Sequence, residues 1–110
     1  MTVEQPSGGI ALRPGDRLRS AVCSTELVVV KAPGHPVDLR CGGVSVVRVD
    51  DPIPDGVSLS ADHAGGSLIG KRYTDGADLE VLCSKSGDGS LSVGGAALEI
   101  KGAKPLPSSD

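Results

Sequence analysis

Hydrophobic residues along the chain fall in short runs that are bounded by glycine, proline or aspartate. Several runs alternate between apolar and polar positions, as in VDLRC at 37–41 and SLSV at 90–93. This period of two and the excess of valine are typical of strands that bury one face. No stretch of about 11 residues or more has helical spacing. The pattern predicts an all-β protein, a small sandwich or a barrel-like pair of β-meanders, in which any helix is a single turn. The predicted strands are residues 26–31, 37–41, 44–49, 57–60, 67–69, 78–83, 90–93 and 96–101.

The spacing of these runs predicts a single all-β domain over residues 12–101. Residues 1–11 contain Gln-Pro-Ser-Gly-Gly and no periodicity, so we expect a flexible N-terminal lead-in. Residues 102–110 are punctuated by proline and are expected to form an extended C-terminal tail.

The chain also resembles itself at an offset of 52 residues, at which residue 26 lies on residue 78. Residues 26–48 then align with residues 78–100 without a gap, and Gly42-Gly43 falls on Gly94-Gly95. Such glycine pairs favour primed hairpin turns, which need positive φ. The segments from Gly15 and Gly70 extend the match to a preceding strand at a different spacing. The pattern predicts an internal duplication in which two thin aliphatic sheets face each other; chance similarity is the alternative.

Composition narrows the possible functions. The chain has 110 residues, a net charge of −3 and one aromatic residue, Tyr73. Without aromatic platforms or a basic excess, we expect no nucleic-acid partner. No apolar run approaches the roughly 18 residues of a membrane span, and no basic leader precedes an apolar stretch. We therefore expect a soluble, cytoplasmic protein with no membrane partner. Its purely aliphatic core predicts a free energy of unfolding of only a few kcal/mol.

Three cysteines, Cys23, Cys41 and Cys83, are the most chemically informative residues. An odd number in a cytoplasmic protein argues against a disulfide framework. The same compartment disfavours a disulfide between Cys23 and Cys41. A metal site, a reactive thiol or plainly buried thiols remain as alternatives.

Residues 19–43 place Cys23 before the run ELVVVK and end on Arg40-Cys41-Gly42-Gly43. This arrangement resembles the desulforedoxin or rubredoxin-type knuckle. In that family a Cys-x-x-Cys precedes a valine-rich strand, a second cysteine pair ends the next strand, and four thiolates bind one iron or zinc. Only Cys23 and Cys41 match ligand positions, because Glu26 and Arg40 stand at the other two. The resemblance therefore implies half of such a metal site.

A complete tetrahedral zinc or iron site would need other donors. The candidate ligand set is Cys23, Cys41 and Cys83 with His35 as the fourth ligand. His63 could replace His35, and the Glu26 carboxylate could supply an oxygen. The alternative is that all three cysteines are small buried hydrophobes, as free cysteines commonly are.

No residue set indicates catalysis, so enzymatic function is undecided and disfavoured. The leading prediction is a small, non-catalytic accessory protein that acts through a partner protein or through self-association, because small β domains expose sheet edges. A zinc- or iron-binding module is the first alternative. A small cysteine-dependent enzyme is the second, and its nucleophile, Cys23 or Cys83, would need a base within hydrogen-bond reach.

Overall fold

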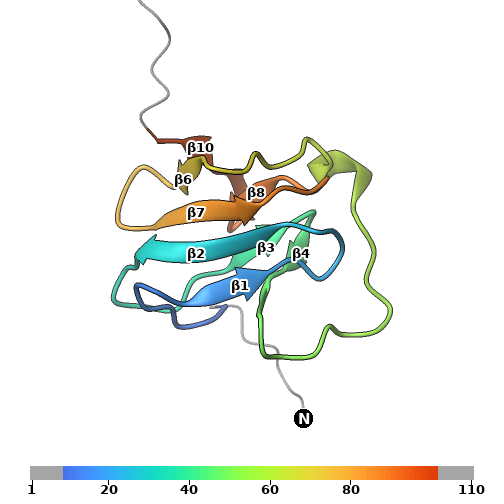
Figure 1. The fold of residues 1–110 in the computed structure, drawn as a ribbon, viewed down its shortest axis with the longest axis horizontal. Helices are drawn as coiled ribbons and strands as arrows, with labels where there is room; N and C mark the ends of the chain where they lie inside the picture. The colour runs from blue at the N-terminus through green and yellow to red at the C-terminus, as the bar shows by residue number, and fades with distance from the viewer. Residues whose placement is uncertain (1–8, 102–110) are drawn as a thin grey trace, which may run out of the picture.

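Two antiparallel sheets face each other in an open sandwich, which confirms the predicted all-β class (Figure 1). The computed structural model describes residues 9–101. The larger sheet has six strands in the order β10-β6-β7-β2-β1-β5, and the smaller has four in the order β4-β3-β8-β9. The strands are β1 Arg17–Arg19, β2 Glu26–Lys31, β3 Leu39–Cys41, β4 Val44–Ser45, β5 Val47–Arg48, β6 Arg72–Thr74, β7 Glu80–Lys85, β8 Leu91–Val93, β9 Ala96–Ala97 and β10 Glu99–Ile100.

Helix is confined, within residues 9–101, to the 3₁₀ turn η1 at Ala61–His63. The Ser60 side chain caps this turn by accepting a hydrogen bond from the backbone N–H of Asp62. In the described part of the chain, no helix is both long and apolar enough to cross a bilayer.

The core lies between the sheets and is almost entirely aliphatic. Alternate residues of the strands turn inward, so Leu27 and Val29 of β2 are buried while Val28 is half-exposed. The fully buried side chains come from both sheets and are Leu18, Leu27, Val29, Leu39, Cys41, Leu79, Val81, Cys83 and Thr25. Burying an apolar side chain of this size stabilises the fold by about 1.5–3 kcal/mol.

Two predicted strands, at 44–49 and 96–101, are each divided in the structure. Val46 separates β4 from β5, and Leu98 separates β9 from β10. The backbone N–H of Val46 donates to Leu39 O at 3.1 Å, and that of Leu98 donates to Leu91 O at 3.0 Å. At these two residues the chain leaves the smaller sheet and enters the larger one, which is how one continuous run serves both layers.

The predicted strands at 57–60 and 67–69 were wrong. Residues 57–60 have no ladder partner, although the N–H of Ser60 donates to Gly42 O at 3.0 Å. Ser67 forms only an isolated bridge with Gly87. Alternating apolar residues therefore form part of a long connection between β5 and β6, because no neighbouring edge is aligned with them over several residues.

Both strand orders read the same from either end, since β1, β2, β3, β4 and β5 occupy places equivalent to β6, β7, β8, β9 and β10. The central pairs show the same relation. Leu27 pairs with Cys83 just as Val29 pairs with Val81, and Arg40 pairs with Ser92.

The offset between the halves is not constant. It is 52 residues from β3 to β8, as residue 39 matches residue 91, but 54 from β2 to β7, as residue 26 matches residue 80. The turn after β2 spans residues 32–38, whereas the turn after β7 spans the shorter 86–90. In the structure Cys83 therefore corresponds to Val29: the N–H of Gly15 donates to Val29 O, and that of Gly70 donates to Cys83 O, both at 2.8 Å.

The start of the described chain is tied to the turn after β2. Ile10 forms an isolated antiparallel bridge with Val37 through hydrogen bonds of 2.9 and 2.8 Å. Leu12 is buried in the core. The remainder of the predicted lead-in, residues 1–8, and the predicted tail, residues 102–110, lie outside the described residues.

A buried carboxylate makes the stability of this fold dependent on pH. Glu80 is paired with Lys101 at 2.7 Å and with Arg72 at 3.4 Å. The hydrogen bond from Lys101 holds the pKa of Glu80 below the ordinary value for a glutamate, 4.5. Because the folded-state pKa is depressed, the stabilisation is present above about pH 4.5 and is lost as the pH falls through the folded pKa. We expect urea midpoints between pH 7 and pH 3 to fall less for Glu80→Gln than for the wild type. Exposed Glu99, on the same sheet, is the control: Glu99→Gln should keep the wild-type pH dependence.

Candidate functional sites: a thiol cluster and a basic sheet face

Two cysteines distant in sequence meet between the sheets. Cys23 lies in the loop of residues 20–25 between β1 and β2, and Cys41 ends β3 in the opposite sheet. Their Sγ atoms are 3.8 Å apart. Cys41 is completely buried, whereas Cys23 is partly exposed. Both are free thiols, so the structure holds a close dithiol with one accessible member.

Polar groups surround the Cys23 sulfur. It lies 3.3 Å from each of the Ser20 and Thr25 hydroxyl oxygens and accepts a hydrogen bond of 3.3 Å from the backbone N–H of Gly89. Burial alone would raise the pKa of Cys23, but these hydrogen bonds outweigh burial and lower that pKa to about 7. A substantial fraction of Cys23 is therefore thiolate at neutral pH.

The other two thiols are held in the protonated form. Burial, with the nearby sulfur of Cys23, raises the pKa of Cys41 to about 11. Burial likewise raises the pKa of Cys83, whose S–H donates to Lys85 O at 3.2 Å. Of the three thiols, Cys23 therefore ionises near neutral pH, whereas Cys41 and Cys83 stay neutral.

Two glycines of the turn after β7 press against the dithiol. A Cβ built on Gly87 would lie 2.9 Å from Cys23 Sγ and 2.6 Å from Thr25 N. A Cβ built on Gly89 would lie 2.9 Å from Cys41 Sγ. These distances are below those of real Cβ contacts, so only glycine allows this backbone to approach the two sulfurs.

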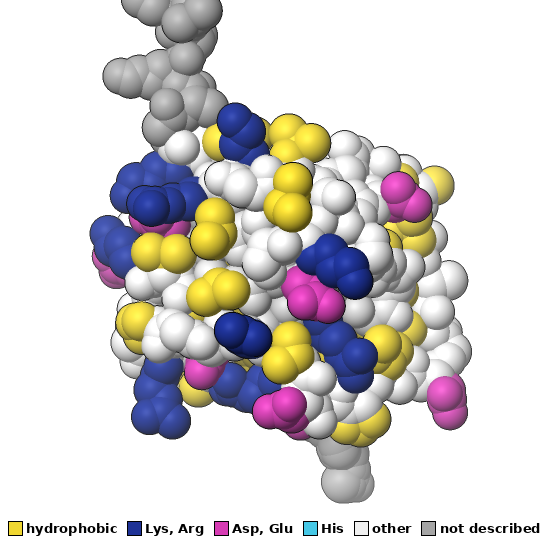
Figure 2. Space-filling model, in the orientation of Figure 1, with side chains coloured by type: hydrophobic (Ala, Val, Ile, Leu, Met, Phe, Trp, Pro, Cys, Tyr) yellow, Lys and Arg dark blue, Asp and Glu magenta, His cyan; other side chains and the backbone are white. Residues whose placement is uncertain are grey.

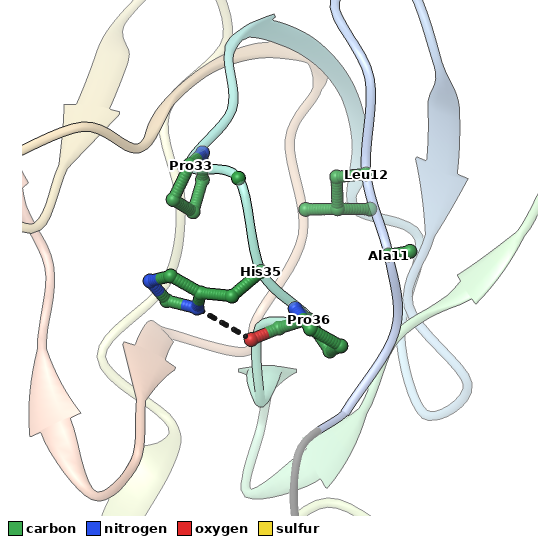
Figure 3. A pocket seen from close by; sticks show the side chains of 6 residues that line it. Ala11, Leu12, Pro33, His35 and Pro36 are labelled. Carbon is green, nitrogen blue, oxygen red and sulfur yellow. Dashed lines mark hydrogen bonds between the residues drawn. The ribbon is translucent and has the colours of Figure 1, made fainter.

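The structure does not bring His35 to the thiols. His35 lies in the turn after β2, past the opposite end of that strand from Cys23. There its Nδ1 lies 3.0 Å from Pro36 O, and the ring borders a hollow of about 190 Å³ beside Leu12 and Pro33 (Figure 3). Within residues 9–101, no group of three or more His, Cys, Asp and Glu side chains is arranged to hold a metal ion.

The two substitute ligands are placed elsewhere as well. Glu26 is the register partner of Arg19 on the outer side of the larger sheet, because its neighbour Leu27 points into the core. His63 ends η1 and lies over the Gly43 turn, where a Cβ built on Gly43 would lie 3.1 Å from His63 Cδ2. The tetrahedral site with Cys23, Cys41, Cys83 and His35 is therefore not assembled in this structure.

A second candidate site is the outer face of the larger sheet, which Figure 1 views directly. Cross-strand partners put Arg17 opposite Val28, Val28 opposite Leu82, and Leu82 opposite Arg72. Register partners share a face, so these four side chains form one row across four strands. The row has an arginine at each end and two aliphatic residues between them. We call it the central row.

The strands of this sheet carry more cations than anions, although the chain has a net charge of −3. Figure 2 shows Lys and Arg side chains interspersed with hydrophobic side chains over this face. By register, the cations on the outer face are Arg17, Arg19, Lys31, Arg72 and Lys85, and the anions are Glu26, Glu80 and Glu99. Arg48 pairs with buried Leu18 and so lies on the inner side. Most aspartates lie instead in turns and connections. The outer face is therefore a basic surface with an aliphatic middle.

The sequence shows which arginines point outward from this sheet, but not that they lie in one row. RLR at 17–19 and RYT at 72–74 each alternate an outward arginine with a buried residue. Only the register of β2 with β7 places the two arginines on one line with Val28 and Leu82 between them.

The knuckle resemblance rests on Cys23 and Cys41 alone, and the two sulfurs do lie together. The other two ligand positions of that motif hold Glu26 on the outer face and Arg40, whose Nε donates to Asp38 at 3.0 Å. The family resemblance stays a prediction. In comparisons with known proteins, the chain matches no protein family, no curated protein and no solved structure.

Proposed function

We propose that this protein is a non-catalytic assembly module in which one copy binds an acidic segment of the next through the basic sheet face. The observation that carries the proposal is the central row, because the same chain also exposes a complementary segment. Residues 50–56, which read DDPIPDG, are all exposed. This segment places Asp51 and Asp55 on either side of Ile53.

The spacing of the two partners is compatible. Three steps between neighbouring strands, at about 4.8 Å each, separate the backbones of Arg17 and Arg72 by roughly 14 Å. Asp51 and Asp55 are four residues apart, which is roughly 12–14 Å in an extended chain. The long arginine side chains absorb a difference of this size, and a guanidinium can bind a carboxylate through two parallel hydrogen bonds. Arg72 already donates from Nη1 to Glu80 at 3.4 Å, so its other N–H groups would bind the partner's carboxylate.

The acidic segment is stiff. Pro52 and Pro54 fix their own φ angles and push the preceding residues, Asp51 and Ile53, toward extended backbone. Arg19 Nη2 donates to the backbone oxygen of Asp51 at 2.6 Å, which anchors the base of the segment. A segment that is already extended loses little conformational entropy on binding.

Ile53 supplies an apolar anchor. Ile53 is 42% exposed, and among the described residues Leu68 and Ile69 are the other exposed large hydrophobic residues. The basic face has a hollow of about 270 Å³ beside Arg17 and Val28. That volume lies below the roughly 300–1,000 Å³ of small-molecule pockets and suits one aliphatic side chain.

The aliphatic middle of the face favours a protein partner over a nucleic acid. Val28 and Leu82 offer no hydrogen bonds to bases, and Tyr73, the one aromatic residue, is buried in the core. A small interface of this kind corresponds to a dissociation constant on the order of 10–100 µM that rises with salt. Contact between two different surfaces can repeat, which yields rings or filaments rather than only dimers.

Complementation between two variants tests the interface. Arg17→Glu disrupts the basic face and leaves the acidic segment intact. The double variant Asp51→Lys, Asp55→Lys disrupts the acidic segment and leaves the basic face intact. Sedimentation velocity at low salt, up to roughly 1 mM protein, should show concentration-dependent assembly of the wild type and monomers of each variant. A mixture of the two variants should form a one-to-one pair and nothing larger, because only one productive contact is left.

The matched control is Arg13→Glu, which makes the same charge change at an exposed residue outside the larger sheet. It should assemble like the wild type. A wild-type protein that stays monomeric throughout the concentration range contradicts the proposal. Binding of a single-stranded oligonucleotide in preference to a second copy also contradicts it.

We also propose that the two halves arose by duplication, supported by the identical order of their strands and the matching turns Gly42-Gly43 and Gly94-Gly95, all at positive φ. The cytoplasmic location stays a prediction.

A further inference from the structure

The dithiol between the sheets is not needed for the proposed assembly, because Cys41 lies in the smaller sheet and the basic face belongs to the larger one. The close approach of the two thiols therefore has to serve another purpose. Cys23 Sγ and Cys41 Sγ are 3.8 Å apart, and a disulfide bond measures about 2.05 Å. Closing the gap requires the two sulfurs to approach each other by less than about 2 Å.

We propose that Cys23 and Cys41 form a peroxide-reactive pair, in which Cys23 is the attacking sulfur and Cys41 converts its oxidised form into a disulfide. The assignment of roles follows from burial. Cys23 is partly exposed in a loop, so it is the cysteine placed to meet a peroxide. Cys41 is completely buried on a strand, so it can react only with the oxidised sulfur of Cys23 beside it.

The chemistry takes place in two steps. The Cys23 thiolate attacks one oxygen of a hydroperoxide, the O–O bond breaks, and Cys23 becomes a sulfenic acid while the released oxyanion takes up a proton. The Cys41 sulfur then attacks the sulfenic sulfur, the S–O bond breaks, and the hydroxide leaves as water with the Cys41 proton. The two sulfurs lose two electrons and the peroxide gains them.

The reverse reaction needs an external dithiol. One of its thiolates attacks the Cys23–Cys41 bond and forms a mixed disulfide, and its second thiolate resolves that bond. The protein regains two thiols, and the external dithiol leaves as a disulfide. The pair is therefore reversible wherever a dithiol reductant is present.

The surroundings of Cys23 fit the attacking role. Burial raises the pKa of Cys23, but its hydrogen bonds with the Ser20 and Thr25 hydroxyls and with the Gly89 N–H outweigh burial. They lower this pKa to about 7, so about half of Cys23 is thiolate at neutral pH. A pKa of about 11 leaves only about one Cys41 in 10⁴ ionised at pH 7. The cysteine that is partly exposed is thus also the one that is deprotonated.

Cys83 provides the internal comparison. It is as deeply buried as Cys41, its pKa is raised, and its S–H donates to Lys85 O. Unlike Cys23 it is fully buried, and it is not part of the 3.8 Å sulfur pair of Cys23 and Cys41. It should therefore react with peroxide only after the protein unfolds.

Hydrogen peroxide is the probe, applied to the reduced full-length protein at pH 7, with the products resolved by mass spectrometry of alkylated peptides. We expect a loss of two hydrogens per chain and a single cross-link between Cys23 and Cys41, reversed by dithiothreitol. Cys83 should be alkylated only in denaturant. Cys23→Ser should slow the loss of thiols about tenfold or more.

Two variants separate the roles. Cys41→Ser should leave sulfenic acid on Cys23, which dimedone captures. Cys83→Ser, the matched control, should form the disulfide as fast as the wild type. In a second measurement, alkylation of Cys23 by iodoacetamide should reach half its maximal rate near pH 7.

Three results would overturn the proposal. The first is that folded protein consumes peroxide without forming the Cys23–Cys41 bond. The second is that Cys83 reacts as fast as Cys23. The third is that alkylation of Cys23 rises only near pH 9, as for an ordinary thiol. Circular dichroism of each variant identifies any that fails to fold, and the pH profile of the wild type decides the case without a variant.

Discussion

Gly87→Ala should lower the free energy of unfolding by about 1–3 kcal/mol or more, because the added methyl group has no space. Its Cβ would lie 2.4 Å from Thr25 Oγ1 and 2.6 Å from Thr25 N. One of these atoms is backbone in a fully buried residue, so the obstacle cannot rotate away. Urea unfolding followed by far-ultraviolet circular dichroism measures the loss.

The matched control is Gly34→Ala. Gly34 lies in the turn after β2, which is the counterpart of the turn after β7, and a Cβ there meets nothing within 4 Å. Neither Gly34 nor Gly87 has positive φ, so backbone strain does not distinguish them. Gly34→Ala should change stability by less than about 0.5 kcal/mol. Equal effects of the two substitutions would show that the close approach at Gly87 is not required.

The same substitution should also disturb the dithiol. The Gly87 methyl group would reach within 2.9 Å of Cys23 Sγ, so the loop of residues 20–25 has to shift. We expect Gly87→Ala protein that still folds to form the Cys23–Cys41 disulfide more slowly. Gly34→Ala should form it at the wild-type rate. The comparison thus links the packing of one turn to the reactivity of the thiol.

Leu27→Ala should cost about 2–5 kcal/mol, the range for emptying a fully buried leucine site. Leu27 is 1% exposed on β2, which pairs with both β1 and β7 at the centre of the larger sheet. We expect a total stability of only a few kcal/mol, so a loss at the upper end would unfold much of the domain. Thermal and urea denaturation at pH 7 measure it.

Leu68→Ala makes the same chemical change at a side chain that is 54% exposed. It removes little buried area, so its effect should stay within about 0.5 kcal/mol. If Leu27→Ala were as mild as Leu68→Ala, the inner face of β2 would not be the core of the fold. Together the two leucines separate burial from the simple loss of apolar atoms.

Local sequence accounts well for the class of fold and for its turns. Valine-rich runs with a period of two predict strands wherever one face is buried, and Gly42-Gly43 and Gly94-Gly95 do adopt the positive φ of primed turns. The same pattern misleads at residues 57–60, because alternation reports the preference of a segment and not whether an edge is available to pair with it.

Pairing between distant strands decided the sites. Cys23 and Cys41 are 18 residues apart and belong to a loop and to a strand of the opposite sheet, so only the packing of the two sheets brings their sulfurs to 3.8 Å. The ionisation of Cys23 also depends on Gly89, a residue 66 positions away. No spacing in the chain encodes that contact.

The charge of the chain could be predicted from composition, but its distribution could not. A net charge of −3 describes the sum, whereas the register of β1, β2, β7 and β6 places Arg17 and Arg72 at the ends of one row. Periodicity assigns each side chain to a face because it depends only on neighbours along the strand. Register depends on which strands meet and at what offset, and neither is fixed by neighbours along one strand. The local sequence therefore determines the all-β class, whereas the dithiol and the basic face are formed only by the tertiary structure.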